Sequence, residues 1–135
     1  MIKEFTTYWE KSKGDLEEFL KTTKQEKYTS YKSLVKALFE KVINPNVNNK
    51  FDTKNILIID DGDYQGTQIF LLHIATYQPS VSDYVYTNTY YGSCSGCDTL
   101  LAISHYNDGY PNDKQVEDYM TLCLHLLQKC CFMGD

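Results

Sequence analysis

The sequence predicts an α+β fold, in which an antiparallel meander sheet of three or slightly more strands packs against a long C-terminal helix and follows an N-terminal helical segment. Apolar residues recur at helical spacing before residue 43 and again after residue 112, and three strand-like segments lie between them. A polar stretch over 44–54 separates the first helical part from the rest. We therefore expect a helical, Lys-rich N-terminal segment over 1–50 and an α+β core domain over 51–135.

The helices are predicted from periodicity and from their end signals. Apolar spacing over 2–20 indicates two short helices, with a break at Gly14-Asp15, and a third helix is expected over 31–42 after Thr29 and Ser30, the two candidate N-caps. The last helix should begin at Asn112 or Asp113. Its predicted inner face consists of Val116, Tyr119, Met120, Cys123, Leu126, Leu127 and Cys130.

Three strands are predicted between these helices, and their order brings distant loops together. The strands are Asn55–Asp60, Thr67–Ala75 and Asp83–Tyr91, and a short helix is expected over Thr99–Ser104. The loop over 61–66 contains two glycines, which we expect to supply positive φ. In a meander this loop and the end of the third strand share one edge of the sheet, and a returning C-terminal helix should bring Cys130 and Cys131 to the same edge.

The segment Cys94-Ser95-Gly96-Cys97 is the most specific chemical signal in the chain. A two-residue spacer lets two thiolates bind one tetrahedral metal ion, and a structural zinc site closes with four ligands. We predict structural zinc held by Cys94, Cys97, Cys130 and Cys131, with Asp61, Asp63, Asp98 or a histidine as substitute ligands. Cys123 should be a buried thiol on the helix face, and Cys130 could equally be one.

Two other functions are compatible with the same cysteines. A CxxC pair ahead of a helix can lower a thiol pKa, as a thiol oxidoreductase requires. The Gly-rich turn could instead present backbone N–H groups to an anion or nucleotide ligand. The chain has no GxSxG, P-loop or dinucleotide-binding pattern and no HxxxH or HxH spacing, so catalysis is not predicted.

Charge is divided unevenly along the chain. Residues 1–50 carry 10 Lys and 7 acidic residues, a net of +3, whereas 51–135 carry 3 Lys and 11 acidic residues, a net of -8, and the two sum to -5 for the whole chain. The chain has no Arg, which argues against direct nucleic-acid binding. An acidic, Tyr-rich body is suited to a basic protein surface. The candidate contact residues are Asp63, Tyr64, Tyr90, Tyr91 and Asp98.

No apolar run is long enough to span a membrane, and the N-terminus lacks the apolar core of a signal peptide. We therefore expect a soluble protein that stays in the cytoplasm. The odd count of 5 Cys fits thiols or a metal site better than a framework of disulfides.

Two stretches carry a resemblance to a known group of proteins. Asp63-Tyr64-Gln65-Gly66 and Tyr91-Gly92-Ser93-Cys94-Ser95-Gly96-Cys97-Asp98 resemble segments of small proteins encoded by phages and their Gram-positive hosts, over residues 55–131. In size, acidity and expected origin the chain also resembles the anti-CRISPR class, some members of which bind zinc structurally and block a Cas nuclease by direct contact. The resemblance implies a non-enzymatic phage inhibitor that binds a bacterial defence nuclease inside the host cell.

Overall fold

The computed structural model describes residues 2–62, 65–92, 98–104 and 109–134. Across these residues the helices are α1 (Lys3–Thr22), α2 (Tyr31–Leu38), α3 (Thr99–Ser104) and α4 (Asp113–Gln128), with a π-helical turn at Phe39–Ile43 and short 3-10 turns at Gln25–Tyr28, Asn44–Asn46 and Val81–Asp83. The strands are β1 (Leu57–Asp60), β2 (Gly66–His73), β3 (Tyr84–Tyr91) and β4 (Cys131–Phe132). They form one antiparallel sheet in the order β1-β2-β3-β4. The predicted α+β class is confirmed.

Helix α1 is one continuous helix, so the predicted break at Gly14-Asp15 is wrong. Gly14 lies in the exposed middle of the helix, with open space where a side chain would stand. A glycine at such a position costs about 1 kcal/mol relative to alanine. Trp9, Leu16 and Leu20 are all buried on one face of α1. Because burial of this face on both sides of Gly14 contributes more than the glycine costs, the helix continues.

The predicted caps are confirmed at two helices. The Ser30 hydroxyl accepts a hydrogen bond from the Ser33 N–H at 3.2 Å and begins α2. The Asn112 side chain accepts one from the Gln115 N–H at 2.8 Å, and the Gln115 side chain accepts one from the Asn112 N–H in return. Each pair satisfies backbone donors that the first turn of a helix leaves free.

The buried core draws on both parts of the chain. One cluster of buried hydrophobic residues contains side chains from α1 and α2 as well as from β2, β3 and α4. The Phe5 ring meets the Phe132 ring at a centroid distance of 6.2 Å, and the Phe39 and Phe51 rings lie 5.4 Å apart. Residues 1–50 and 51–135 therefore share one hydrophobic core.

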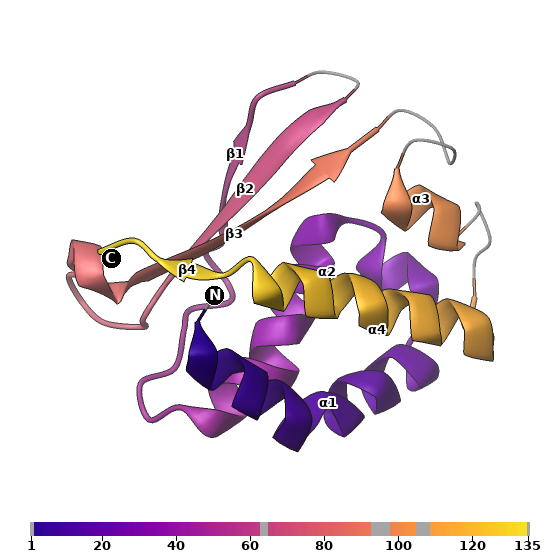
Figure 1. Cartoon of the computed structure of the whole chain (residues 1–135), viewed down its shortest axis with the longest axis horizontal. Helices are drawn as coiled ribbons and strands as arrows, with labels where there is room; N and C mark the ends of the chain where they lie inside the picture. The colour runs from indigo at the N-terminus through magenta and orange to yellow at the C-terminus, as the bar shows by residue number, and fades with distance from the viewer. Residues whose placement is uncertain (1, 63–64, 93–97, 105–108, 135) are drawn as a thin grey trace.

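The sheet is covered on one face. Along β3, residues Val85, Thr87 and Thr89 are buried, whereas the residues between them are partly or fully exposed. The Thr87 hydroxyl donates to the Leu126 carbonyl of α4 at 2.6 Å, so this inner face lies against the helices. The strands β1, β2 and β3 extend beyond the helical layer, as Figure 1 shows. The uncovered face of the sheet is therefore the face that points away from α4.

Candidate functional site

Hydrophobic and aromatic side chains gather on the uncovered face of the sheet. Strand register places Leu57 opposite Leu71, Ile59 opposite Ile69, and Leu71 opposite Tyr86. Residues directly opposite one another in a sheet point to the same side, and their neighbours two positions along a strand do too. We call this side of the sheet the outer sheet face. Its hydrophobic and aromatic members are Leu57, Ile59, Ile69, Leu71, Tyr84, Tyr86 and Tyr90, and the register also places Thr67, His73 and Asn88 on it.

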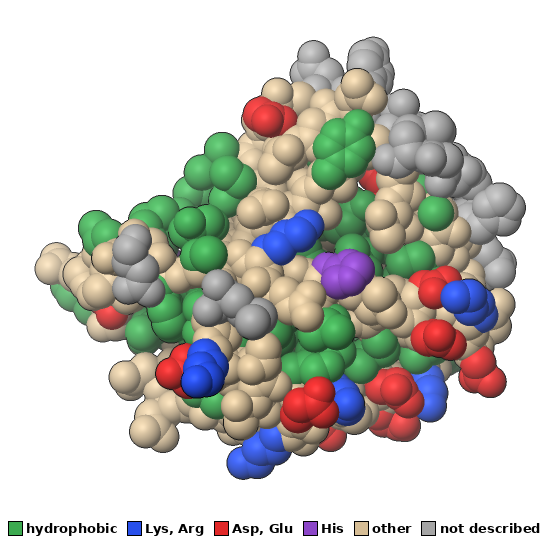
Figure 2. Space-filling view, viewed as in Figure 1, with side chains coloured by type: hydrophobic (Ala, Val, Ile, Leu, Met, Phe, Trp, Pro, Cys, Tyr) green, Lys and Arg blue, Asp and Glu red, His purple; other side chains and the backbone are tan. Residues whose placement is uncertain are grey.

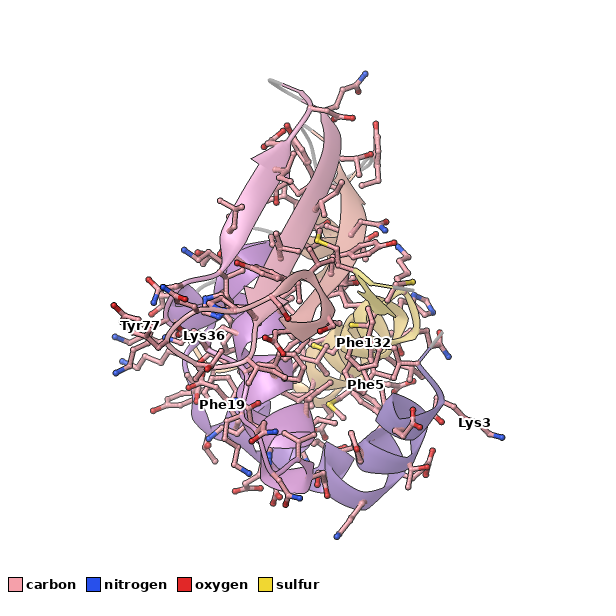
Figure 3. All side chains as sticks on the ribbon, turned by 90° about the vertical axis from the view of Figure 1, so that its left-hand side faces the viewer. Lys3, Phe5, Phe19, Lys36, Tyr77 and Phe132 are labelled. Carbon is pink, nitrogen blue, oxygen red and sulfur yellow. The ribbon has the colours of Figure 1, made fainter. Side chains whose placement is uncertain are left out.

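Within β1, β2 and β3, the outer sheet face carries no acidic or lysine side chain, and its residues are partly or fully exposed. Leu57 is 56% exposed, Ile59 50% and Tyr90 54%. Figure 2 shows hydrophobic side chains gathered on the surface where Figure 1 places β1 and β2, and Figure 3 shows the strands standing beyond the helices after a 90° turn. A contiguous exposed apolar patch of this kind marks an interaction site more often than an ordinary surface.

Carboxylates stand at the hairpin end of the sheet, where Asp60 points to the side opposite the outer sheet face because it pairs with Gln68. The Asp60 carboxylate accepts hydrogen bonds from the Tyr91 hydroxyl at 2.6 Å, the Gln68 amide at 3.0 Å and the Gly62 N–H at 3.0 Å. These bonds, with the Tyr91 hydroxyl as the largest cause, lower the pKa of Asp60 below its ordinary value. Asp61 accepts the Thr67 N–H at 2.7 Å. The hairpin end is therefore acidic near neutral pH.

Gly62 and Gly66 of the hairpin are required because the turn leaves no room for a side chain, and not because their φ is positive. Among the described glycines only Gly109 has a positive φ, so the conformation predicted for Gly62 and Gly66 is wrong. A Cβ at Gly62 would overlap the backbone carbonyl oxygen of Gln65. One at Gly66 would lie 2.6 Å from a carboxylate oxygen of Asp61. The turn brings two backbone segments so close that neither position accepts a side chain.

Asp98 lies inside the protein, which makes its predicted role as a surface contact wrong. It is 6% exposed, and its carboxylate accepts hydrogen bonds from the Tyr31 hydroxyl at 2.6 Å and from the N–H groups of Gly92 and Leu100, both at 2.9 Å. Burial and this hydrogen bond raise the pKa of the Tyr31 hydroxyl. Asp98 thus joins the end of β3, the start of α3 and helix α2.

The predicted return of Cys130 and Cys131 to the end of β3 is also wrong, whereas Cys94 and Cys97 lie outside the described residues. Cys131 pairs with Tyr86 near the start of β3, whereas Gly92 and Asp98, which flank the CxxC segment, lie past its other end. Five residues of strand separate Tyr86 from Tyr91, which is about 17 Å. Helix α4 begins beside α3, where the Gln115 side chain donates to the Ile103 carbonyl at 3.1 Å, and its last turn leads to β4 beside the start of β3.

The described cysteines behave as core or isolated thiols. Cys123 is fully buried as predicted, and burial raises its pKa to about 12. The Cys130 thiol is also buried, donates to the Leu126 carbonyl at 3.4 Å, and has a pKa raised to about 12 by burial. Cys131 is partly exposed and free. A thiol held protonated inside the core is a poor metal ligand or nucleophile.

Four of the predicted site residues lie outside the described residues, and these are Asp63, Tyr64, Cys94 and Cys97. Within the described ranges, no group of three or more His, Cys, Asp or Glu side chains could hold a metal ion. Tyr90 is exposed on the outer sheet face. Tyr91 is partly buried, and its hydroxyl donates to the Asp60 carboxylate. The hydroxyl of Tyr90 lies 3.4 Å from the Gln65 side chain.

The aliphatic half of the outer sheet face was not among the predicted contacts. Apolar runs over 56–59 and 69–72 indicate strands that are buried on both sides. Because Leu57, Ile58 and Ile59 are all apolar, both sides of β1 are apolar, and no local sequence signal marks which face of the sheet stays open.

A scan against protein-family models, a search of curated proteins and a search of solved structures found no match to this chain. Among the described helices, none is both long enough and apolar enough to cross a bilayer. The fold and the outer sheet face together define an α+β protein with a sheet covered on one side and an exposed apolar and aromatic surface on the other.

Proposed function

We propose that this chain is a non-enzymatic protein-binding module, and that its outer sheet face is the binding site. The observation that carries the proposal is the joining of exposed aliphatic side chains on β1 with tyrosines on β3 in one uncharged surface. Aromatic side chains contribute a large share of binding energy at the centres of protein interfaces, and charged residues are depleted there. The three tyrosines Tyr84, Tyr86 and Tyr90 fit that composition.

The charge of the surroundings favours a basic partner. Asp60 and Asp61 stand at the hairpin end of the sheet, next to the outer sheet face, and hydrogen bonds favour the ionised form of Asp60. Residues 51–135 carry 11 acidic residues against 3 Lys. Such a charge distribution raises the rate of association with a positively charged surface, and that association rate falls as the salt concentration rises. A nucleic-acid groove of another protein has this charge.

The particular partner that we propose is a bacterial defence nuclease of the Cas type, which the chain would inhibit by occupying its basic surface. This step is supported by the resemblance of Tyr91–Asp98 to proteins of phages and their hosts, and by the acidic, Arg-free body. The protein would then act in the cytoplasm of the host cell. It would need no catalytic residue.

Alanine replacement of two tyrosines tests the proposal. Tyr86→Ala together with Tyr90→Ala should weaken binding to the nuclease by about 100-fold or more, because each interface tyrosine of this kind contributes about 2 kcal/mol. The measurement is calorimetric titration against a panel of purified, guide-loaded Cas nucleases, together with DNA cleavage assays. The matched control is Tyr110→Ala, which removes an exposed tyrosine that lies outside the sheet.

The control variant should bind and inhibit as the wild type does. Equal binding by the double variant would remove the outer sheet face from the proposal. Absence of inhibition across the panel, at both low and high salt, would refute the nuclease as partner.

A structural zinc ion at Cys94 and Cys97 is a separate proposal, now without Cys130 and Cys131 as ligands, because those two lie at the other end of β3. Elemental analysis should find about one zinc per chain, lost in Cys94→Ser and kept in Cys131→Ser. Loss of zinc should also lower the melting temperature. A metal-free wild type with a thiol of low pKa would instead support the alternative of a thiol oxidoreductase.

A further inference from the structure

We infer that two copies of this chain form a symmetric dimer by pairing their β1 strands antiparallel, with Ile58 of each copy at the two-fold axis. The pairing would join two four-stranded sheets into one sheet of eight strands. This inference goes beyond the proposed function, since it concerns the edge of the sheet and holds whether or not a nuclease binds the outer sheet face.

Strand β1 is an open edge. It is the first strand in the sheet order, and among the described residues it pairs only with β2. All four of its residues are exposed. Natural edge strands are usually blunted by lysine, proline or a bulge, because free N–H and C=O groups recruit another strand. Leu57, Ile58 and Ile59 contain none of these devices.

Hydrogen-bond parity shows which backbone groups are free. The Asp61 N–H donates to the Thr67 carbonyl at 3.2 Å, and these residues are opposite one another when the register of β1 and β2 is extended by one residue. In an antiparallel pair, hydrogen-bonded residues alternate with residues that face away. Leu57 and Ile59 therefore bond to β2, and Ile58 directs its N–H and C=O to the open edge. Two Ile58 residues can exchange a reciprocal pair of hydrogen bonds across a two-fold axis.

The side chains select the same register. Centring on Ile58 places Leu57 opposite Ile59 of the second copy, so that outer-face residues meet outer-face residues and every central pair is aliphatic. Centring on Ile59 would place Ile58 opposite Asp60 of the second copy and Leu57 opposite Asp61. Centring on Asp60 would place two carboxylates face to face, which is destabilising.

This pattern is self-complementary, and it therefore favours a second copy of the chain as the partner of β1. The same short segment on each copy supplies aliphatic side chains that meet one another and keeps the carboxylates apart. The two-fold axis stands perpendicular to the sheet, so both outer sheet faces lie on the same side of the dimer. Pairing along one short strand buries little area, and we expect a weak, reversible dimer.

Sedimentation velocity from about 5 to about 500 µM protein tests the dimer, since contacts of this size have dissociation constants in the micromolar to millimolar range. The wild-type sedimentation coefficient should rise with concentration. Ile58→Lys should stay monomeric throughout, because two lysines would meet at the axis. Val81→Lys is the matched control, a change at a hydrophobic side chain that is 61% exposed outside the strands, and it should dimerise as the wild type does.

A cysteine pair tests the register without relying on the fold of the lysine variant. The double variant Leu57→Cys with Ile59→Cys should form a disulfide-linked dimer on mild oxidation, identified by peptide mass spectrometry as a 57–59 link between chains, because residues opposite one another outside the hydrogen-bonded pairs lie about 4.5 Å apart. Efficient linkage by Ile59→Cys alone would overturn the register centred on Ile58.

A wild type that remains monomeric over the whole range would overturn the dimer, and so would an Ile58→Lys variant that dimerises normally. If the monomeric wild type binds the nuclease and Ile58→Lys does not, the edge belongs to the partner, which also overturns the dimer. The variants at Tyr86 and Tyr90 test the proposed function separately, since neither residue lies on β1.

Discussion

Residues 51–135 expressed without residues 1–50 are expected to remain unfolded. Helix α4 buries Val116, Tyr119, Leu126 and Leu127 in the cluster that α1 and α2 complete. Removing the N-terminal segment would expose this face to water along with the inner face of the sheet. The free energy of unfolding of a small domain is only about 5–15 kcal/mol, and each large buried side chain contributes about 1.5–3 kcal/mol, so the loss exceeds what the remainder can tolerate.

Polar contacts between residues 1–50 and residues 51–135 lead to the same expectation. The Tyr119 hydroxyl of α4 donates to the Gln25 side-chain oxygen at 2.8 Å, and the Tyr119 ring meets the Tyr28 ring edge-on at 5.1 Å. Tyr28 in turn donates to the Leu20 carbonyl at 3.0 Å. Without residues 1–50, the Tyr119 hydroxyl loses this partner and its ring loses its cover.

Far-UV circular dichroism and a ¹⁵N NMR correlation spectrum of the 51–135 fragment would check this expectation. A spectrum of narrow dispersion should result, and addition of a separate 1–50 peptide should restore at least part of the dispersion. The matched full-length control is Leu16→Ala, which leaves a cavity in the same cluster and should cost about 2–5 kcal/mol without abolishing the fold. A well-dispersed spectrum from the fragment alone would show that residues 51–135 form an independent domain.

Replacing Asp98 with alanine is expected to lower the free energy of unfolding by about 2–4 kcal/mol. The carboxylate is buried and accepts hydrogen bonds from the Tyr31 hydroxyl and from the backbone N–H groups of Gly92, Leu100 and Leu101. Removing a buried acceptor leaves its donors without partners, and the loss is larger when the acceptor is charged. The substitution also removes the side chain that caps α3.

Chemical denaturation of matched variants measures the size of this effect. Tyr31→Phe removes one donor and should cost about 1 kcal/mol, well below Asp98→Ala. Asp15→Ala, at an exposed carboxylate on α1, should change stability by less than about 0.5 kcal/mol. If Asp98→Ala were as mild as Asp15→Ala, the hydrogen-bond cluster around Asp98 would not stabilise the fold. Loss of nuclease binding without loss of stability would restore Asp98 as a contact residue.

The local features of this protein could be predicted because neighbouring residues carry their signals. Ser30 and Asn112 are capping residues, and both begin helices as expected. The three strands follow from short apolar runs between polar loops. The local error at Gly14 arose because the helix is stabilised by packing of its buried face, which outweighs the propensity of a single residue.

The site could be predicted only in part, because exposure is a property of the assembled protein. Tyr90 was predicted as a surface contact and lies on the outer sheet face, whereas Asp98, seven positions beyond the end of β3, is buried by donors that come from α2 and α3. The thiols of Cys130 and Cys131 were placed by an assumed path of the chain. That path brought the last helix back to the end of β3, whereas Cys131 pairs with Tyr86 near its start.

The sequence by itself determined the α+β class, the helix and strand segments, the caps at Ser30 and Asn112, and the burial of Cys123. Each of these depends on periodicity or on contacts within a few residues. Only the tertiary structure decided which end of β3 receives Cys131, which face of the sheet stays open, and that Asp98 is internal. Those features depend on contacts between residues far apart in the chain, such as Tyr31 with Asp98, and such contacts exist only after the core has formed around both parts of the chain.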